Sequence, residues 1–368
     1  MAAVPVRPCR VSRLGQAVLV VGTVALASCG SGVSTAGSGK PAERAREHPT
    51  TTGPGRSPTT VPPRSGGGGA GGPGAPLPVP AALSPFSSPA PADEGAWHPA
   101  GRPVGGVPAI YETTMVPPGG AQPAGIAWMD THLLSALLYS GSKSPGGGPY
   151  LSTAPVEPVQ AASLVAAFNG GFLMDTGGGY FTEGRAVVPL VTGAASLVIY
   201  ANGTVGVGVW GDDMSMTSNV VSVRQNLQPL VEGGRPTPQA MGPDWQLWGN
   251  TCGATSCASS VPGVEQQWRS GAGVTADGAL VYATGPLLAP LQLAQLLVRA
   301  GVVRGMELDI NPSWTFLVTY DPTDPGGLAA PGNGTRLLPD TVQGPATAFD
   351  PAWARDFVTM SARTTPTG

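Results

Sequence analysis

Two carboxylates and an amide alternate along a short hydrophobic segment near the C-terminal end of the chain. Glu307, Asp309 and Asn311 occupy every second position. On a β-strand such residues point to one face, while the apolar residues between them point to the other. Carboxylates on a hydrophobic strand are costly unless they are paired or used in chemistry. Because only 11% of the residues are charged, this segment is the first candidate for a catalytic site.

Two carboxylates close together suit general acid–base catalysis at a glycosidic bond. Residues i and i+2 of a strand lie ~6.5–7 Å apart at the backbone. This overlaps the carboxylate separations of retaining enzymes, about 5–5.5 Å, and of inverting enzymes, about 6.5–9.5 Å, so it selects neither. The alternative is a structural role in which each carboxylate pairs with an arginine. The candidate partners are Arg185, Arg224, Arg269 and Arg304.

A second candidate is the turn Asn169-Gly170-Gly171-Phe172, which follows an apolar segment. Glycines let a backbone come close to a ligand, so Asn169 and the N–H groups of Gly170 and Gly171 could contact a substrate. An ordinary tight turn is the alternative.

Arg269 is a third candidate, because it precedes a glycine-bordered strand and could hold a phosphate or a carboxylate with two hydrogen bonds. A structural arginine is the alternative. The polar residues 224–228 could bind sugar hydroxyls or could equally fix their own loop. Asp309, Glu307 and Asn311 offer oxygen ligands for a hard cation, but their spacing matches no calcium loop. We therefore predict no metal and no cofactor.

Local patterns predict the elements that position these groups. Strands are expected at residues 109–115, 125–129 and 164–168. Asn202-Gly203 and Asp277-Gly278 each predict a hairpin with a type I′ turn. The clearest helix covers residues 290–300, with Gly301 just past its end, and leads into the acidic strand. Many strands and few helices predict an α+β fold, a single globular domain with a mixed or antiparallel β-sheet core.

Residues 1–28 predict an export signal, with three arginines before a short apolar segment. The segment ends in Leu26-Ala27-Ser28-Cys29, which resembles a bacterial lipobox, and the alternative is a plain secretory signal cut near Ala27. Lipidation of Cys29 would add two acyl chains, enough for stable attachment. We therefore expect an exported lipoprotein on the outer face of the bacterial cytoplasmic membrane.

Composition divides the remaining chain. Residues 29–96 are rich in glycine, proline, serine, threonine and alanine, so they are predicted to be a disordered linker. Residues 97–363 are expected to fold, and residues 364–368 form a polar tail. A net charge of -3 argues against a nucleic-acid partner. Cys252 and Cys257 could close a small disulfide loop, because export permits oxidation.

The order and spacing of these motifs resemble the phosphodiester glycosidase family over residues 125–320. The family pattern is Asn-Gly-Gly-aromatic, then an arginine with a Gly-x-Val-x-x-Asp-Gly hairpin, then a helix and a strand ending in Asn-Leu-Asp-Gly-Gly-Gly-Ser. The matching segments are Asn169-Gly170-Gly171-Phe172, Arg269 with the 273–278 hairpin, and Glu307 to Ser313. Here the family's glycine run is replaced by Ile310-Asn311-Pro312, which removes room and one N–H donor.

The resemblance implies a membrane-tethered hydrolase that acts on a sugar-1-phosphodiester or a related glycosidic bond in the cell envelope. Asp309 would be a general acid, a general base or an electrostatic stabiliser, with Glu307 as its partner carboxylate. Arg269 would hold the phosphate, and Asn169 with the two glycines would orient the sugar. The lost glycines motivate an alternative, a non-catalytic lipoprotein that binds envelope glycans in the same cleft. A purely structural lipoprotein is the third hypothesis.

Overall fold

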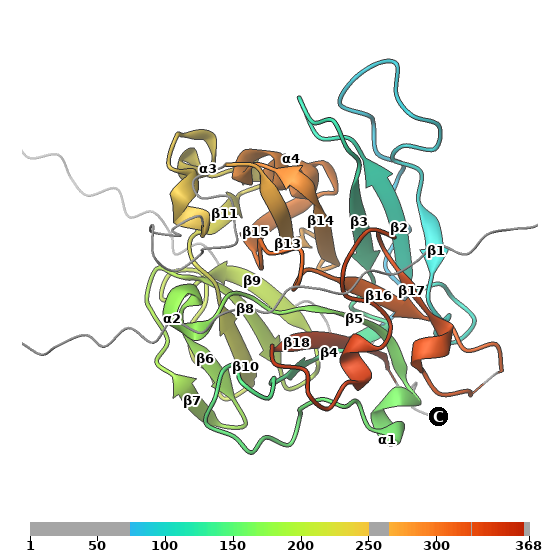
Figure 1. Cartoon of the computed structure of the whole chain (residues 1–368), viewed down its shortest axis with the longest axis vertical. Helices are drawn as coiled ribbons and strands as arrows, with labels where there is room; N and C mark the ends of the chain where they lie inside the picture. Colours follow the sequence, from blue (N-terminus) through green and yellow to red (C-terminus); the bar gives the residue numbers. More distant parts are fainter. Residues whose placement is uncertain (1–73, 250–264, 325, 364–368) are drawn as a thin grey trace, which may run out of the picture. The chain divides into compact units, whose positions relative to one another are not determined.

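The computed structural model describes residues 74–249, 265–324 and 326–363 (Figure 1). The predicted signal peptide, Cys29, residues 29–73 of the linker, the Cys252–Cys257 pair and the polar tail lie outside the described residues. Within the described ranges, no helix combines the length and hydrophobicity needed to cross a bilayer.

Three antiparallel sheets form the framework of the described chain, with few and short helices. The largest sheet has eight strands in the order β1-β2-β3-β14-β13-β15-β11-β12. Its strands are β1 (His98–Ala100), β2 (Ile110–Met115), β3 (Ala124–Met129), β11 (Pro229–Glu232), β12 (Arg235–Pro236), β13 (Gln267–Thr275), β14 (Leu280–Leu288) and β15 (Val302–Glu307). The predominance of strands agrees with the expected fold class, and the sheet pairing is of the antiparallel kind.

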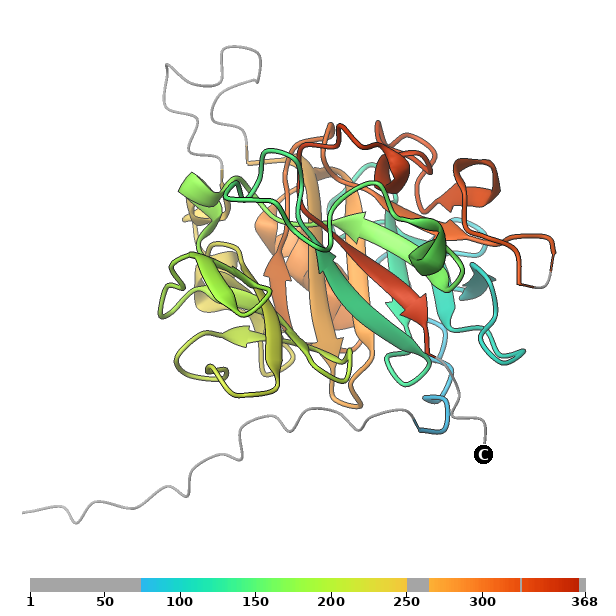
Figure 2. The same cartoon turned by 90° about the horizontal axis from the view of Figure 1, so that it is seen from below.

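The other two sheets have five strands each, in the orders β7-β6-β10-β8-β9 and β17-β16-β5-β18-β4. The first contains β6 (Tyr180–Thr182), β7 (Arg185–Val188), β8 (Ala195–Tyr200), β9 (Val205–Val209) and β10 (Val220–Gln225). The second contains β4 (Leu134–Tyr139), β5 (Leu164–Asn169), β16 (Leu317–Tyr320), β17 (Gly334–Arg336) and β18 (Phe357–Ala362). Figure 2 shows β18, the last of the described strands, lying between β4 and β5.

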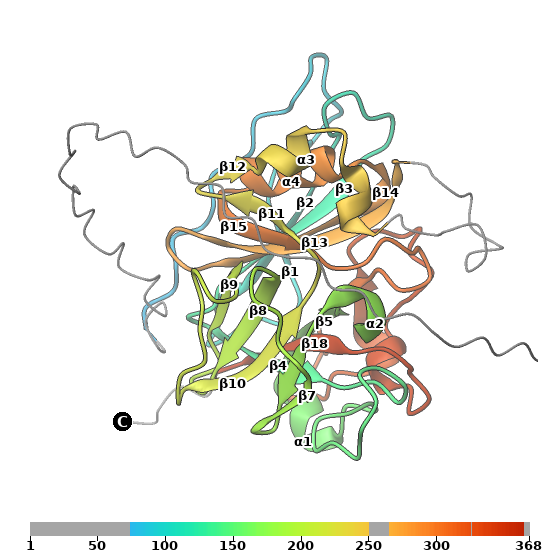
Figure 3. The ribbon, with the colours of Figure 1, turned by 90° about the vertical axis from the view of Figure 1, so that its left-hand side faces the viewer.

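The main core lies where one face of the large sheet meets both smaller sheets (Figure 3). Met306 and Tyr282 of the large sheet share this core with Phe168 and Met360 of one small sheet and Leu197 of the other. The burial of all three sheets against one another stabilises their shared arrangement through the hydrophobic effect. It also fixes the ends of the strands that carry the candidate residues.

The opposite face of the large sheet is covered by α4 (Pro290–Arg299). Leu293, Leu296 and Leu297 of α4 are fully buried, as the predicted apolar stripe requires. Gly301 follows with φ +89°, the left-handed conformation expected just beyond a helix end. The shorter helices are α1 (Pro158–Ala161), α2 (Met174–Gly177) and α3 (Pro238–Met241), and the 3₁₀ turns cover Trp245–Trp248, Pro331–Asn333 and Thr347–Phe349.

Both predicted hairpins form, but their turns are not of type I′. A type I′ turn needs positive φ at both central residues, whereas only the glycines Gly203 (φ +75°) and Gly278 (φ +93°) have it. In each loop a backbone hydrogen bond encloses three residues, from Tyr200 N–H to the Thr204 carbonyl and from Thr275 N–H to the Ala279 carbonyl. The longer loop lets the residue before each glycine keep ordinary negative φ.

The end of the predicted linker contacts the folded part. Leu77 is buried beside the α4 side of the large sheet, and its N–H donates to Asp130 Oδ2 at 2.8 Å. The guanidinium of Arg299 lies 4.0 Å from the ring centre of Phe86. Residues from Leu77 onward therefore pack against the domain ahead of Trp97, where the change in composition had placed its start.

Candidate functional site

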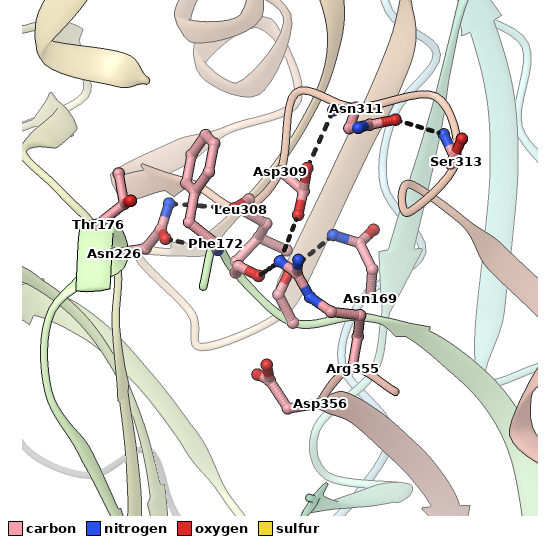
Figure 4. Close-up of polar contacts among 12 residues, drawn as sticks. Asn169, Phe172, Thr176, Asn226, Leu308, Asp309, Asn311, Ser313, Arg355 and Asp356 are labelled. Carbon is pink, nitrogen blue, oxygen red and sulfur yellow. Dashed lines mark hydrogen bonds and ion pairs between the residues drawn. The ribbon is translucent and has the colours of Figure 1, made fainter. Parts of the chain in front are cut away.

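Strand ends from all three sheets meet at the candidate site (Figure 4). β5 ends at Asn169, β10 ends at Gln225, β15 ends at Glu307, and β18 begins at Phe357. Gly170 N–H donates to the Asp356 carbonyl at 3.0 Å, which joins the end of β5 to the start of β18. The side chain of Asn226 donates to the carbonyls of Glu307 and Leu308, at 2.9 and 3.1 Å.

Asp309 lies just beyond β15 and is 2% exposed. Its Oδ2 accepts a hydrogen bond from Arg355 Nη2 at 2.9 Å, and its Oδ1 accepts one from Asn311 N–H at 2.9 Å (Figure 4). Burial raises the pKa of Asp309 to about 6, and the charge of Arg355 opposes this rise. Asp309 is therefore a buried carboxyl group that can gain or lose a proton near neutral pH.

Glu307 is fully buried and pairs with Arg269 Nη1 at 2.7 Å. Its second oxygen, Oε1, is buried with no hydrogen-bond partner. Burial raises the pKa of Glu307 to about 7 against the opposing effect of Arg269. Each acidic residue of the motif thus has its own arginine, as the structural alternative anticipated, although Arg355 was not among the candidate partners.

The acidic strand is shorter than the alternating pattern predicts. β15 stops at Glu307, and Asn311 is exposed, so the three polar residues do not share one strand face. The side chain of Asp309 captures the N–H of Asn311, and Asn311 Oδ1 captures that of Ser313 at 2.9 Å. Such local bonds compete with strand pairing, which accounts for the early end.

Asn169 is buried, and both the oxygen and the nitrogen of its side-chain amide form hydrogen bonds within the protein. Oδ1 accepts from Tyr282 Oη at 2.7 Å and from Phe316 N–H at 3.1 Å. Nδ2 donates to the Gly170 carbonyl at 2.7 Å and to Ser270 Oγ at 3.0 Å. Asn169 therefore ties β5 to the large sheet, and in this arrangement its amide has no unused group for a sugar.

The two glycines permit close packing of backbone against the buried ion pairs. A Cβ on Gly170 would clash with the carboxylate of Asp356, and one on Gly171 would lie 2.6 Å from Asn226 Oδ1. Gly171 also presents its carbonyl to Arg355 Nη2 at 2.8 Å. The turn is thus specialised for its packing, which is more than an ordinary tight turn requires.

Arg269 is fully buried and points its guanidinium at protein acceptors. It donates to the carbonyls of Leu288 (2.7 Å), Trp248 (3.1 Å) and Glu265 (2.7 Å), in addition to Glu307. In this arrangement it holds Glu307 in place, and the guanidinium nearest Asp309 belongs to Arg355.

Three neighbouring residues complete the site, and sequence reasoning did not assign them this role. Arg224 donates to Asp356 at 2.7 Å and to the carbonyl of Phe172. Arg355 and Asp356 themselves escaped notice. The sequence does contain a signal for them, because two adjacent residues of opposite charge directly precede the apolar strand β18 in a chain with few charged residues. Arg224 and Asn226 fix their own loop, which is the second of the two alternatives given for residues 224–228.

Aromatic rings lie beside Arg355. Its guanidinium carbon is 5.2 Å from the ring centre of Trp314, which in turn meets Trp353 edge to face at 5.5 Å. Arg355 Nε and Thr315 Oγ1 are buried without hydrogen-bond partners. Unpartnered buried polar atoms are uncommon and costly. Here one belongs to Arg355 itself, and the other belongs to Thr315, the residue after Trp314.

Two surface hollows lie away from these residues. One is lined in part by Val207, Pro229 and Arg304, and the other by His98, Glu112 and Leu337. Across the described ranges, no group of three or more His, Cys, Asp or Glu side chains is placed to hold a metal ion.

No protein-family model and no curated protein sequence matches this chain. Among solved structures, it is similar to the zebrafish N-acetylglucosamine-1-phosphodiester alpha-N-acetylglucosaminidase catalytic domain auto-inhibited by its pro-peptide, at 16% identity and a TM-score of 0.44, over 73% of this chain and 88% of that one. A hypothetical protein from Synechocystis is similar at 10% identity and a TM-score of 0.40, over 72% and 64%. A predicted exported protein from Burkholderia pseudomallei is similar at 13% identity and 0.34, over 65% and 73%.

Proposed function

We propose that this chain is a hydrolase that acts on a sugar-1-phosphodiester or a related glycosidic bond, with its site at Asp309 and Arg355. The observation that carries the proposal is the buried pair itself. A carboxyl group with a pKa of about 6 lies 2.9 Å from an arginine that still has an unpartnered nitrogen. A pKa near the working pH is what a general acid or base requires.

Hydrolysis of such a substrate breaks the bond between the anomeric carbon and a phosphate oxygen. Water supplies the new hydroxyl of the sugar, and the phosphate leaves as a monoester. Because a phosphate monoester has a second pKa of about 6, it leaves without the protonation that an alkoxide needs. We therefore assign Asp309 the role of general base toward water, and Arg355 the role of balancing the phosphate charge.

The remaining predicted residues take supporting roles in this proposal. Glu307 is the second carboxylate and keeps one free oxygen, with Arg269 positioning it. Asn169, Gly170 and Gly171 hold the turn that presents a carbonyl to Arg355. Trp314 offers an aromatic face on which a sugar ring can stack. A cell-envelope substrate and a lipid anchor at Cys29 belong to the same proposal.

A binding module is the second candidate, and one observation favours it. Ile310-Asn311-Pro312 stands where the family has glycines, and Asp309 is 2% exposed. Both features restrict the approach of a substrate. In this alternative the site recognises envelope glycans without turnover.

The test is a mass-spectrometric assay of the full-length protein on a panel of sugar-1-phosphodiesters. Asp309→Asn should lower turnover by about 10²–10⁴-fold, the usual contribution of a general base. Asp340→Asn, a matched change at an exposed carboxylate, should leave it unchanged. Full activity of Asp309→Asn would refute the assignment of the site. No turnover by the wild type, together with micromolar glycan binding, would establish the binding module.

A further inference from the structure

Ser270 of β13 holds the main chain of Asp309 in place after the strand that leads to it has ended. The side chain of Ser270 is fully buried. Its carbonyl accepts a hydrogen bond from Leu308 N–H at 2.7 Å, and its N–H donates to the Asp309 carbonyl at 2.8 Å. These two bonds continue the pairing of β13 with β15 beyond Glu307, the last residue of β15. Ser270 is therefore the backbone partner of the proposed base.

The hydroxyl group of Ser270 adds a second attachment to the same residue. Its Oγ accepts from Asp309 N–H at 3.2 Å and donates to the Asp309 carbonyl at 3.3 Å. It also accepts from Asn169 Nδ2 at 3.0 Å. A serine hydroxyl has one proton to donate and two lone pairs to accept with. Ser270 thus uses its full hydrogen-bonding capacity, and two of its three side-chain bonds go to the main chain of Asp309.

The direction of these bonds is fixed by groups that can only donate. Phe316 N–H donates to Asn169 Oδ1 at 3.1 Å, so the other end of the amide, Nδ2, is the end that faces Ser270. Tyr282 Oη donates to the same Oδ1 at 2.7 Å. Burial raises the pKa of Tyr282, so it remains a hydroxyl donor at neutral pH. Side chains from β14, β5 and β13 therefore form one chain of hydrogen bonds that ends at Asp309.

The charged neighbours of Asp309 lie on other elements than Ser270. Arg355 precedes β18, Arg224 is on β10, and Glu307 ends β15. Both arginines lower the pKa of Asp309 against the effect of burial, and the charge of Asp309 in turn raises the pKa of Glu307 and of Tyr282. The energy of two charges depends on their separation and is little screened when they are buried. A looser Asp309 would therefore have a weaker contact with Arg355 and a higher pKa.

We propose that Ser270 is a positioning residue, which keeps Asp309 beside Arg355. Asn169 and Tyr282 hold the Ser270 hydroxyl in turn. The hydroxyl contacts only the main chain of Asp309, so it acts through that residue and transfers no proton itself. The inference rests on the proposed function where it makes Asp309 the general base. A displacement of about 1 Å within an active site can lower the rate about 10²-fold, so a bond to the main chain of the base has a large effect on catalysis.

The experiment measures the pKa of Asp309 by NMR of its carboxyl carbon in the full-length protein. Ser270→Ala removes the hydroxyl but keeps both backbone bonds. We expect it to raise the pKa of Asp309 by about half a unit or more, which is roughly threefold tighter proton binding. Thr131→Val is the matched control, because it removes a buried hydroxyl that donates to the Gly278 carbonyl at 2.7 Å, in the turn between β13 and β14. An unchanged pKa in Ser270→Ala, or equal shifts in the two variants, would overturn the proposal.

Kinetics connect the position of Asp309 to the reaction. Ser270→Ala should lower kcat/KM by roughly 10- to 100-fold, mainly through kcat, because the base is displaced while the substrate contacts remain. The midpoint of its pH profile should rise together with the pKa from NMR. Full kcat/KM in Ser270→Ala would overturn the proposal. A wild type without turnover would refute the proposed hydrolysis alone, since the NMR measurement needs no turnover and still decides whether Ser270 positions Asp309.

A second variant keeps the test decisive if Ser270→Ala does not fold. Tyr282→Phe preserves the ring and removes only the hydroxyl that donates to Asn169 Oδ1. It should raise the pKa of Asp309 in the same direction by a smaller amount, because it acts two hydrogen bonds further away. The double variant should show the shift of Ser270→Ala and no more, since both changes act through one chain of bonds. An unchanged pKa in Tyr282→Phe, or additive shifts in the double variant, would overturn this chain.

Discussion

Arg355 and Asp356 are neighbours in the chain, but their side chains form ion pairs with two different parts of the fold. Arg355 donates to Asp309, just after β15, and Asp356 accepts from Arg224 on β10. Both pairs are buried, so their geometry depends on all three sheets being in place. The start of β18 therefore connects the two ion pairs of the site.

Breaking the Asp309–Arg355 pair should be costly for the fold. Arg355→Met leaves the Asp309 carboxylate buried and unpaired, so we expect the free energy of unfolding to fall by about 3–5 kcal/mol. Urea denaturation measures this. As a control, Arg304→Met removes the partly exposed pair with Asp213 and should cost about 1 kcal/mol or less.

Restoring an apolar pair should separate stability from activity. Arg355→Met combined with Asp309→Leu replaces the ion pair with side chains of similar size, which should recover most of the lost stability. Turnover should stay absent, because the base and the phosphate-binding charge are both gone. Recovered turnover in this double variant would show that the pair is structural only.

The activity should depend on pH through Asp309. A general base acts when it is ionised, and burial raises the pKa of Asp309 to about 6. We therefore expect kcat/KM to rise as the pH increases through about 6 and then to level off. A pH profile on the best substrate measures this, and a fall of kcat/KM through the same range would assign Asp309 the role of general acid.

The first glycine of the turn should not tolerate a side chain. Gly170→Ala places a Cβ against the carboxylate of Asp356, so we expect a loss of about 1–3 kcal/mol, in the range of overpacked cores. Gly332→Ala is the matched control, because a Cβ there meets no atom within 4 Å. Equal thermal stability of the two variants in calorimetry would contradict the packing described for Gly170.

The stability of the fold should fall as the pH rises through neutrality. Burial raises the folded-state pKa of Glu112 to about 7, above its ordinary value of 4.5, so the folded state binds more protons between these pH values. The stabilising effect of protonation is complete below about pH 4.5 and is lost as the pH rises through 7. Each unit of pKa difference corresponds to about 1.4 kcal/mol.

Glu112→Gln tests this linkage, because the variant has no proton to lose at this position. Its thermal midpoint should depend less on pH between 4.5 and 8 than that of the wild type, and it should be the more stable of the two at pH 8. Parallel curves for the two proteins would contradict the raised pKa.

Local sequence patterns predicted much of the fold. β2, β3 and β5 begin or end within one residue of the expected bounds, and α4 ends at Arg299 where the helix was expected to end at Ala300. Hydrophobic periodicity and helix-end chemistry act over a few residues, so they can be recognised without knowing the tertiary structure. The predicted turn types were wrong because a three-residue loop satisfies the same Asn-Gly and Asp-Gly signals.

The partners within the site could not be predicted in the same way. Glu307 and Asp309 stood out by their spacing, but Arg355 is 46 residues from Asp309, in a segment that joins the site only through sheet packing. The choice among several arginines depends on which strands become neighbours, and no local pattern records this. The hollow at Glu112 likewise requires β1, β2 and the segment after β17 to meet.

The position of β18 has a consequence for how the protein is made. This strand is inserted between β5 and β4, and it brings Arg355 and Asp356 with it. A nascent chain that has not yet passed residue 355 on the ribosome lacks the arginine beside Asp309 and cannot close the middle of that sheet. In the proposed hydrolase, a chain that stops before Arg355 is therefore expected to be both unstable and inactive.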